Sequence, residues 1–204
     1  MSKRYHLEAL DPYLLFLLFI GVGLGTVLLP QPVRMAVLWT TLALLSVFYR
    51  GQYKVSLDFS LSALGRGALL GGVVSLPLLA FLSTQLQPFV ERLYATQDIV
   101  ALFYQICFVA APVEEYFLRG VLRETKGASI SIALYAVTAL LYFLPHAPVL
   151  ASLIMLVGMG LFGLVYNYVR ERYGLAAAIA CHVVVGFFLQ VMPSVLKALR
   201  LVLF

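Results

Sequence analysis

The fold is decided by a stretch of 22 residues at positions 99–120, which reads IVALFYQICFVAAPVEEYFLRG. Its first 15 residues carry no charge, and an α-helix needs roughly 20 apolar residues to cross a bilayer. Three charged residues follow: Glu114, Glu115 and Arg119. The apolar run is continuous rather than alternating, which favours a helix over a strand. We therefore predict a membrane-spanning helix that carries ionisable groups.

The composition of the whole chain is typical of a membrane protein. Of its 204 residues, 63% are hydrophobic and 11% are charged, whereas soluble domains are about 45–50% apolar and about 25% charged. This difference excludes a soluble globular domain, a disordered chain and a nucleic-acid-binding protein. The net charge of +5 does not indicate nucleic-acid binding, because the basic residues are scattered at the ends of apolar runs. We expect a multi-pass protein in a lipid bilayer.

Apolar runs recur along the chain and predict an all-α transmembrane helix bundle of seven to eight spans. The predicted spans cover residues 13–29, 35–49, 63–82, 99–118, 128–145, 149–169 and 174–190. The last stretch, 191–204, is apolar but carries Lys197 and Arg200, so we expect a short eighth helix or an interfacial one. Cys107 and Cys181 lie inside apolar runs, which predicts small core residues rather than a disulfide.

Positively charged loop residues predict the orientation of the bundle. They gather at the N-terminus and after the second, fourth and sixth spans, while the opposite loops hold Arg34 and Arg92. This bias predicts a cytoplasmic N-terminus.

Lys3 and Arg4 resemble the start of a signal peptide, but the apolar run that follows is too long for one, so we expect a retained helix. The short loops of the chain suggest a bacterial plasma membrane.

Five ionisable residues stand out in the predicted spans or directly at their ends, where each is a candidate functional residue: Glu114, Glu115, Arg119, His146 and His182. Glu115 and Arg119 are four apart, so they share a helix face and can form an ion pair. Glu114 points about 100° away from that face. A carboxylate without a paired cation in a low-dielectric site suits a general base near neutral pH. The alternative for Glu115 and Arg119 is a structural ion pair that locks helices together.

Proline and histidine residues extend this candidate site. Pro112 lacks a backbone N–H, and a local helix break there would open a water-accessible pocket. His146 ends the predicted fifth span, and His182 lies in the middle of the seventh. Each histidine alone is as readily an interfacial or a core residue. Because the glutamates and both histidines occur in one small membrane protein, a shared site is the simplest interpretation.

The order of these motifs resembles the CPBP family of type II CAAX prenyl endopeptidases and Abi-related membrane proteins. The resemblance lies in Ala-Pro-Val-Glu-Glu-x-x-x-Arg-Gly at 111–120, an aromatic-x-x-x-His motif from Tyr142 to His146, and Tyr-Gly-Leu-x-x-x-Ile-x-x-His at 173–182. It covers roughly residues 99–190. On this resemblance the chain divides into N-terminal transmembrane helices (1–98), a catalytic helix core (99–190) and a short or interfacial C-terminal helix (191–204).

The resemblance implies an intramembrane glutamic endopeptidase that needs no metal or other cofactor. Glu114 would activate water, and His146 and His182 would hold that water or stabilise the oxyanion. Glu115, Arg119 and Tyr142 would shape the site. The substrate would be a membrane-associated protein or peptide, and a bacteriocin leader or a C-terminal membrane-anchor signal suits a bacterial chain better than a prenylated protein.

The chain departs from the family pattern one turn after the last histidine. The family has Asn or Asp there, and this sequence has Gly186. Residues 182 and 186 share a helix face, which we expect to be turned toward a polar cavity. We therefore predict that asparagine is tolerated at position 186.

Four other functions compete with a glutamic protease. A metal-dependent membrane protease could use the two histidines and two glutamates, although the His-Glu-x-x-His pattern is absent. A thiol protease would use Cys107 or Cys181, which core packing already explains. A non-catalytic immunity or scaffold relative would bind a membrane peptide without cleaving it. A transporter is a weaker alternative, because no symmetric halves are evident.

Overall fold

The computed structural model describes residues 11–49, 55, 57, 59–96, 98–143 and 147–203, and this part of the chain contains helices and no strand. Three of its segments, labelled η, are π-helices. The elements are α1 (Pro12–Gly25), α2 (Gln31–Tyr49), α3 (Leu61–Tyr94), α4 (Ile99–Tyr104), η1 (Gln105–Ala110), α5 (Ala111–Glu115), η2 (Tyr116–Leu122), α6 (Arg123–Lys126), α7 (Ala128–Phe143), α8 (Val149–Tyr173), α9 (Leu175–Gly186), η3 (Phe187–Val191) and α10 (Met192–Leu203).

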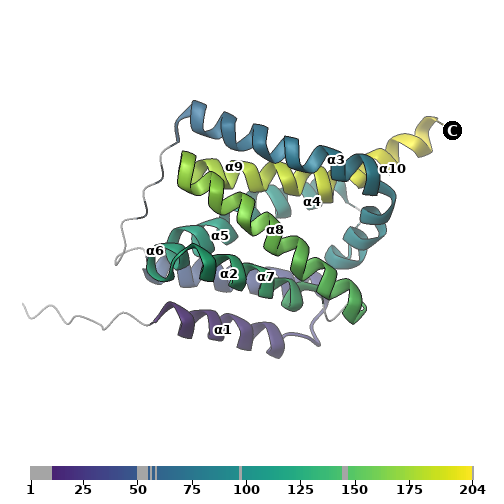
Figure 1. Cartoon of the computed structure of the whole chain (residues 1–204). Helices are drawn as coiled ribbons and strands as arrows, with labels where there is room; N and C mark the ends of the chain where they lie inside the picture. Colours follow the sequence, from purple (N-terminus) through teal and green to yellow (C-terminus); the bar gives the residue numbers. More distant parts are fainter. Residues whose placement is uncertain are drawn as a thin grey trace, which may run out of the picture.

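These elements join into seven helical rods, one for each predicted span (Figure 1). Five of the rods are long and apolar enough to cross a membrane, while α1 and α7 are shorter. The protein is thus a helical multi-pass membrane protein, and the prediction of seven to eight spans is supported for five of them. The C-terminal stretch that we predicted as a short or interfacial helix is helical and follows η3 without interruption.

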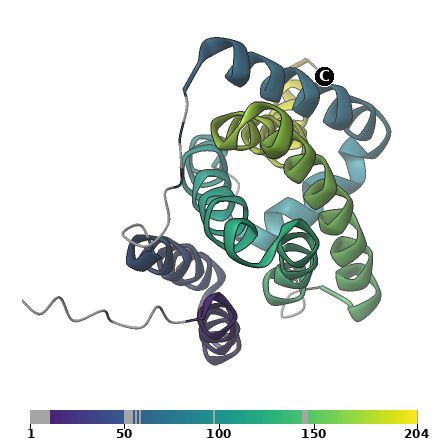
Figure 2. The same ribbon diagram turned by 60° about the vertical axis from the view of Figure 1, so that its left-hand side comes forward.

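The packing of α3 against α9 depends on small residues. Gly67 and Gly71 of α3 are buried against α9, and a Cβ atom at Gly71 would lie 2.6 Å from the carbonyl oxygen of Cys181. A Cβ at Gly67 would overlap the carbonyl group of Ala177. Glycine therefore lets the two backbones touch, as is common between membrane helices. Figures 1 and 2 show α3 lying alongside α9.

The helix is not broken at Pro112, a possibility that the sequence left open, because the helical rod runs from Ile99 to Lys126. The π-helix η1 ends two residues before Pro112, and the N–H of Ala111 bonds the carbonyl of Ile106, five residues back. A proline removes the N–H that an α-helix would offer to the carbonyl four residues earlier. The π-turn shifts the hydrogen-bond register by one residue, so the helix absorbs the proline instead of breaking.

The glutamates lie on the inner side of this rod. Helix α5 packs against α2 and α9, and η2 packs against α2 and α7. Helix α1 lies at the edge of the bundle, beside α2 (Figure 2). The polar residues of the α4–α6 rod are therefore enclosed by α2, α7 and α9.

Candidate active site

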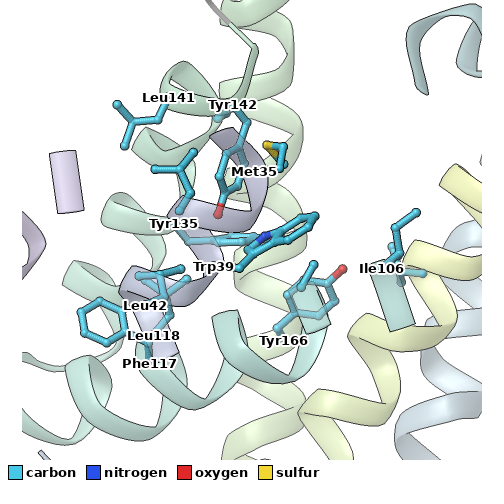
Figure 3. Packing of buried hydrophobic residues seen from close by; sticks show 14 of the residues in the cluster. Met35, Trp39, Leu42, Ile106, Phe117, Leu118, Tyr135, Leu141, Tyr142 and Tyr166 are labelled. Atoms are coloured by element: carbon cyan, nitrogen blue, oxygen red, sulfur yellow. The ribbon is translucent and has the colours of Figure 1, made fainter. Parts of the chain in front are cut away.

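Glu114 is buried and is held by two uncharged donors. Its Oε1 atom accepts hydrogen bonds from the Tyr142 hydroxyl at 3.0 Å and from the Trp39 indole nitrogen at 3.3 Å. Its relative exposure is 5%, and no cation forms an ion pair with it among the described residues. Figure 3 shows the side chains of Trp39 and Tyr142 close together, one from α2 and the other from α7. Because both donors use one oxygen, the described hydrogen bonds leave Oε2 unused.

Glu115 has the opposite environment, since it binds two potential cations. Its Oε1 lies 3.1 Å from a guanidinium nitrogen of Arg119, which is the predicted pairing one turn along the helix. The same oxygen lies 2.9 Å from Nδ1 of His182 in α9. The side chains of Glu115 and Arg119 are fully buried. This three-residue network holds His182 against the glutamate helix through its Nδ1 atom.

Two tyrosines enclose the Arg119–His182 side of the site. The Arg119 guanidinium carbon lies 4.1 Å from the ring centre of Tyr135 and 5.3 Å from that of Tyr166. The Tyr166 ring stacks on His182 with 4.5 Å between the ring centres and 17° between the planes. Aromatic faces attract a guanidinium group, so they reduce the cost of burying it.

The structure brings together five of the six predicted site residues. Glu114 and Tyr142 form one hydrogen-bonded group, and Glu115, Arg119 and His182 form the other. The two groups meet because the two glutamates are adjacent in the chain. The sixth residue, His146, lies outside the described residues, so its role stays a prediction.

Sequence reasoning missed Trp39 and Arg34, both on α2. Trp39 is the single tryptophan of the chain, and nothing in its apolar span marked it as a partner of Glu114. Arg34 was assigned to a loop from its position near a span end. Instead it is fully buried, and its guanidinium donates to the carbonyl oxygens of Gly23 and Leu141. A charge inside α2 is the signal that could have identified it.

The prediction for Gly186 is wrong, because this residue does not face a polar cavity. Gly186 is buried, and a Cβ atom there would lie 2.6 Å from Cγ2 of Ile106 in η1. That methyl belongs to a β-branched side chain with little freedom to move away. Gly186 is thus a close contact between α9 and η1, and asparagine at this position would have to displace the Ile106 side chain.

The described residues contain no group of three histidine, cysteine or acidic side chains arranged to hold a metal ion. A site that included His146 is not covered by this observation. The thiol of Cys107 lies near the carbonyl oxygen of Val183, 3.9 Å away, and Cys181 is fully buried. Both cysteines are free, and their positions agree with the predicted packing role.

A comparison with known protein families finds a match to the part of the chain that holds most of this site. A family model described as type II CAAX prenyl endopeptidase, Rce1-like, matches residues 96–188. Over this segment the chain is similar to the Rce1-like family. The match confirms the resemblance to CAAX-type membrane proteases and supports a protease function. It includes the glutamates, Tyr142 and His182, whereas α2 with Trp39 and Arg34 lies outside it. No curated protein and no solved structure matches the chain.

The arrangement provides the chemical groups that peptide hydrolysis needs. No cation forms an ion pair with the Glu114 carboxylate among the described residues, so this group is available to accept a proton from water. His182 binds Glu115 through Nδ1, which leaves Nε2 for a water molecule or a developing oxyanion. Enclosed, pre-positioned groups of this kind act more strongly than the same groups in water, because they need little reorganisation during the reaction.

Proposed function

We propose that the protein is a CAAX-type intramembrane endopeptidase in which Glu114 is the general base. The observation that carries the proposal is the contrast between the two adjacent glutamates. Glu115 is neutralised by Arg119 and bound to His182. Glu114 is buried with two neutral donors on one oxygen. The Rce1-like match over this segment supports the reaction class.

In the proposed reaction, Glu114 removes a proton from a water molecule as the water oxygen attacks the carbonyl carbon of the scissile peptide bond. The negative charge that develops on the carbonyl oxygen is stabilised by His182 and His146. The Glu114 proton then passes to the leaving nitrogen as the carbon–nitrogen bond breaks. Trp39 and Tyr142 keep the carboxylate in a fixed orientation through both steps.

The proposed substrate is a membrane-associated peptide, because the glutamates lie inside a helix bundle whose surface is apolar. Two probes represent the two substrate classes. One is a farnesylated peptide with three residues after the modified cysteine, which is the substrate type in the family's name. The other is a peptide with an unmodified hydrophobic tail, as in a bacteriocin leader or an anchor signal.

The test is cleavage of each probe by purified protein in liposomes, with products identified by mass spectrometry. The proposal predicts a defined cleavage of at least one probe that continues after metal-chelator treatment. Cleavage that chelation stops and zinc restores would contradict the glutamic mechanism and support the metal-dependent alternative. Measured zinc content before and after treatment is the control.

A non-catalytic role has one specific observation in its favour. The position where the family has an amide or carboxylate is Gly186, which is packed against Ile106 and offers no donor. A scaffold relative would bind the hydrophobic-tail peptide without cleaving it. Saturable binding of that peptide, with no cleavage of either probe, would favour this alternative.

A further inference from the structure

Arg34 is a buried cation that the proposed reaction does not use. It is the fourth residue of α2, it is fully buried, and it forms no ion pair with a carboxylate among the described residues. Its NH2 group donates to two backbone oxygens, that of Gly23 in α1 at 3.2 Å and that of Leu141 in α7. Burying a charge without a counter-ion is costly, so the burial of Arg34 indicates a specific role.

The contacts of Arg34 join three helices at one point. Gly23 lies near the end of α1, and Leu141 lies two residues before the end of α7. The carbonyl groups in the last turn of a helix have no partner within the helix, and a cation there interacts favourably with the helix dipole. Arg34 therefore ties the final turn of α7 to the first turn of α2.

This tie acts on Glu114 through the next residue of α7. Tyr142 follows Leu141 directly, and its hydroxyl donates to Oε1 of Glu114 at 3.0 Å. The other donor to that oxygen is Trp39, which lies on α2 five residues after Arg34. One helix thus supplies a direct donor through Trp39 and holds the backbone that carries the second donor. Figure 3 shows Leu141 and Tyr142 on the turn next to Trp39.

We propose that Arg34 is a positioning residue that holds Tyr142 against Glu114. Without it, the last turn of α7 is released, and the Tyr142 hydroxyl moves away from the carboxylate. The part of the inference that concerns turnover rests on the proposed function, whereas the positioning itself does not. It can therefore be measured without any substrate.

The first experiment uses Trp39 as a reporter, because it is the single tryptophan of the chain and touches Glu114. Emission spectra are compared for wild type, Arg34→Met, Tyr142→Phe and the double variant, each purified as a monodisperse fraction. We expect Arg34→Met and Tyr142→Phe to shift the emission in the same direction. The double variant should match Tyr142→Phe alone, because two changes that remove the same interaction are not additive.

Two further variants separate positioning from general stability. Arg34→Lys keeps a charge and can donate to a carbonyl oxygen, so its spectrum should return toward that of wild type. Its remaining shift should be smaller than that of Arg34→Met and in the direction of Tyr142→Phe, and this keeps the test available if Arg34→Met does not fold. Arg172→Met removes an exposed arginine at the end of α8 and should leave the spectrum unchanged. An unchanged spectrum in both Arg34 variants, or additive shifts in the double variant, would overturn the proposal.

The second experiment measures cleavage of whichever peptide probe wild type hydrolyses. We expect Arg34→Met to lower kcat by about 10- to 100-fold, the effect of losing one hydrogen bond to a charged group, while KM stays near that of wild type. The decrease should equal that of Tyr142→Phe and should not grow in the double variant. Coupled emission shifts without cleavage by wild type would refute the proposed function and leave the positioning role intact. A decrease in the double variant equal to the product of the single effects would overturn the positioning role.

Discussion

Glu114 and Glu115 are consecutive buried carboxylates with different partners, and their difference begins with helix geometry. Successive residues point about 100° apart, so one side chain meets Arg119 and His182 while the other meets Trp39 and Tyr142. The spacing to Arg119 was sufficient to predict which glutamate would be paired. The same substitution at the two positions is therefore expected to have different effects.

Glu115→Gln should lower the amount of folded protein. The change leaves Arg119, which is fully buried, without its carboxylate, and breaking a buried ion pair typically costs about 3–5 kcal/mol. The measurement is the midpoint of thermal unfolding in detergent, with Glu114→Gln as the matched control because that glutamate has no cation partner among the described residues. Equal midpoints in the two variants would contradict the assigned pairing.

At the scale of helices, the three π-helical segments could not be predicted from the sequence. The sequence predicted seven apolar runs, and each is a helix, because continuous hydrophobicity is the dominant local signal. It also left open a break at Pro112, and just before this residue the helix instead changes its hydrogen-bond register. The segment η1 packs against α9, and such tertiary contacts are information that a single sequence does not carry.

The close contact at Gly186 leads to a prediction opposite to the one drawn from the family pattern. Gly186→Asn should destabilise the protein by about 1–3 kcal/mol, the usual cost of overfilling a packed core. The control is Gly72→Asn, since a Cβ at Gly72 meets nothing within 4 Å. The two variants are compared by thermal unfolding in detergent. A Gly186→Asn protein as stable as the control would mean that α9 and η1 are not in contact at this point.

Most of the candidate site was also predictable, because intramembrane charges are rare and stand out in an apolar sequence. Trp39 could not be found in this way, since an indole in an apolar span looks like any other buried aromatic residue. Arg34 was missed because a span end and a buried helix turn have the same sequence pattern. Only the packing of α2 against α5 and the hydrogen bond from Arg34 to Leu141 of α7 distinguish these cases, and sequence spacing does not report how helices pack.

At the scale of the whole molecule, the orientation in the membrane stays a prediction from the positive charges. A reporter fused after Lys126 should lie in the cytoplasm, and one fused after Ala147 should lie on the opposite side. The measurement pairs alkaline phosphatase with a cytoplasmic fluorescent reporter at both positions. The reverse pattern would contradict the predicted cytoplasmic N-terminus, and it would also exchange the face from which a soluble portion of the substrate approaches.

The most direct test of the account is the turnover of Glu114→Gln on the probe that wild type cleaves. The variant keeps the size and polarity of the side chain but removes its ability to accept a proton from water. We expect the variant to insert and unfold like wild type, and its kcat to fall by about 10²–10⁴-fold, the usual contribution of a general base. Near-normal turnover by a folded Glu114→Gln protein would contradict the assignment of Glu114 as the base.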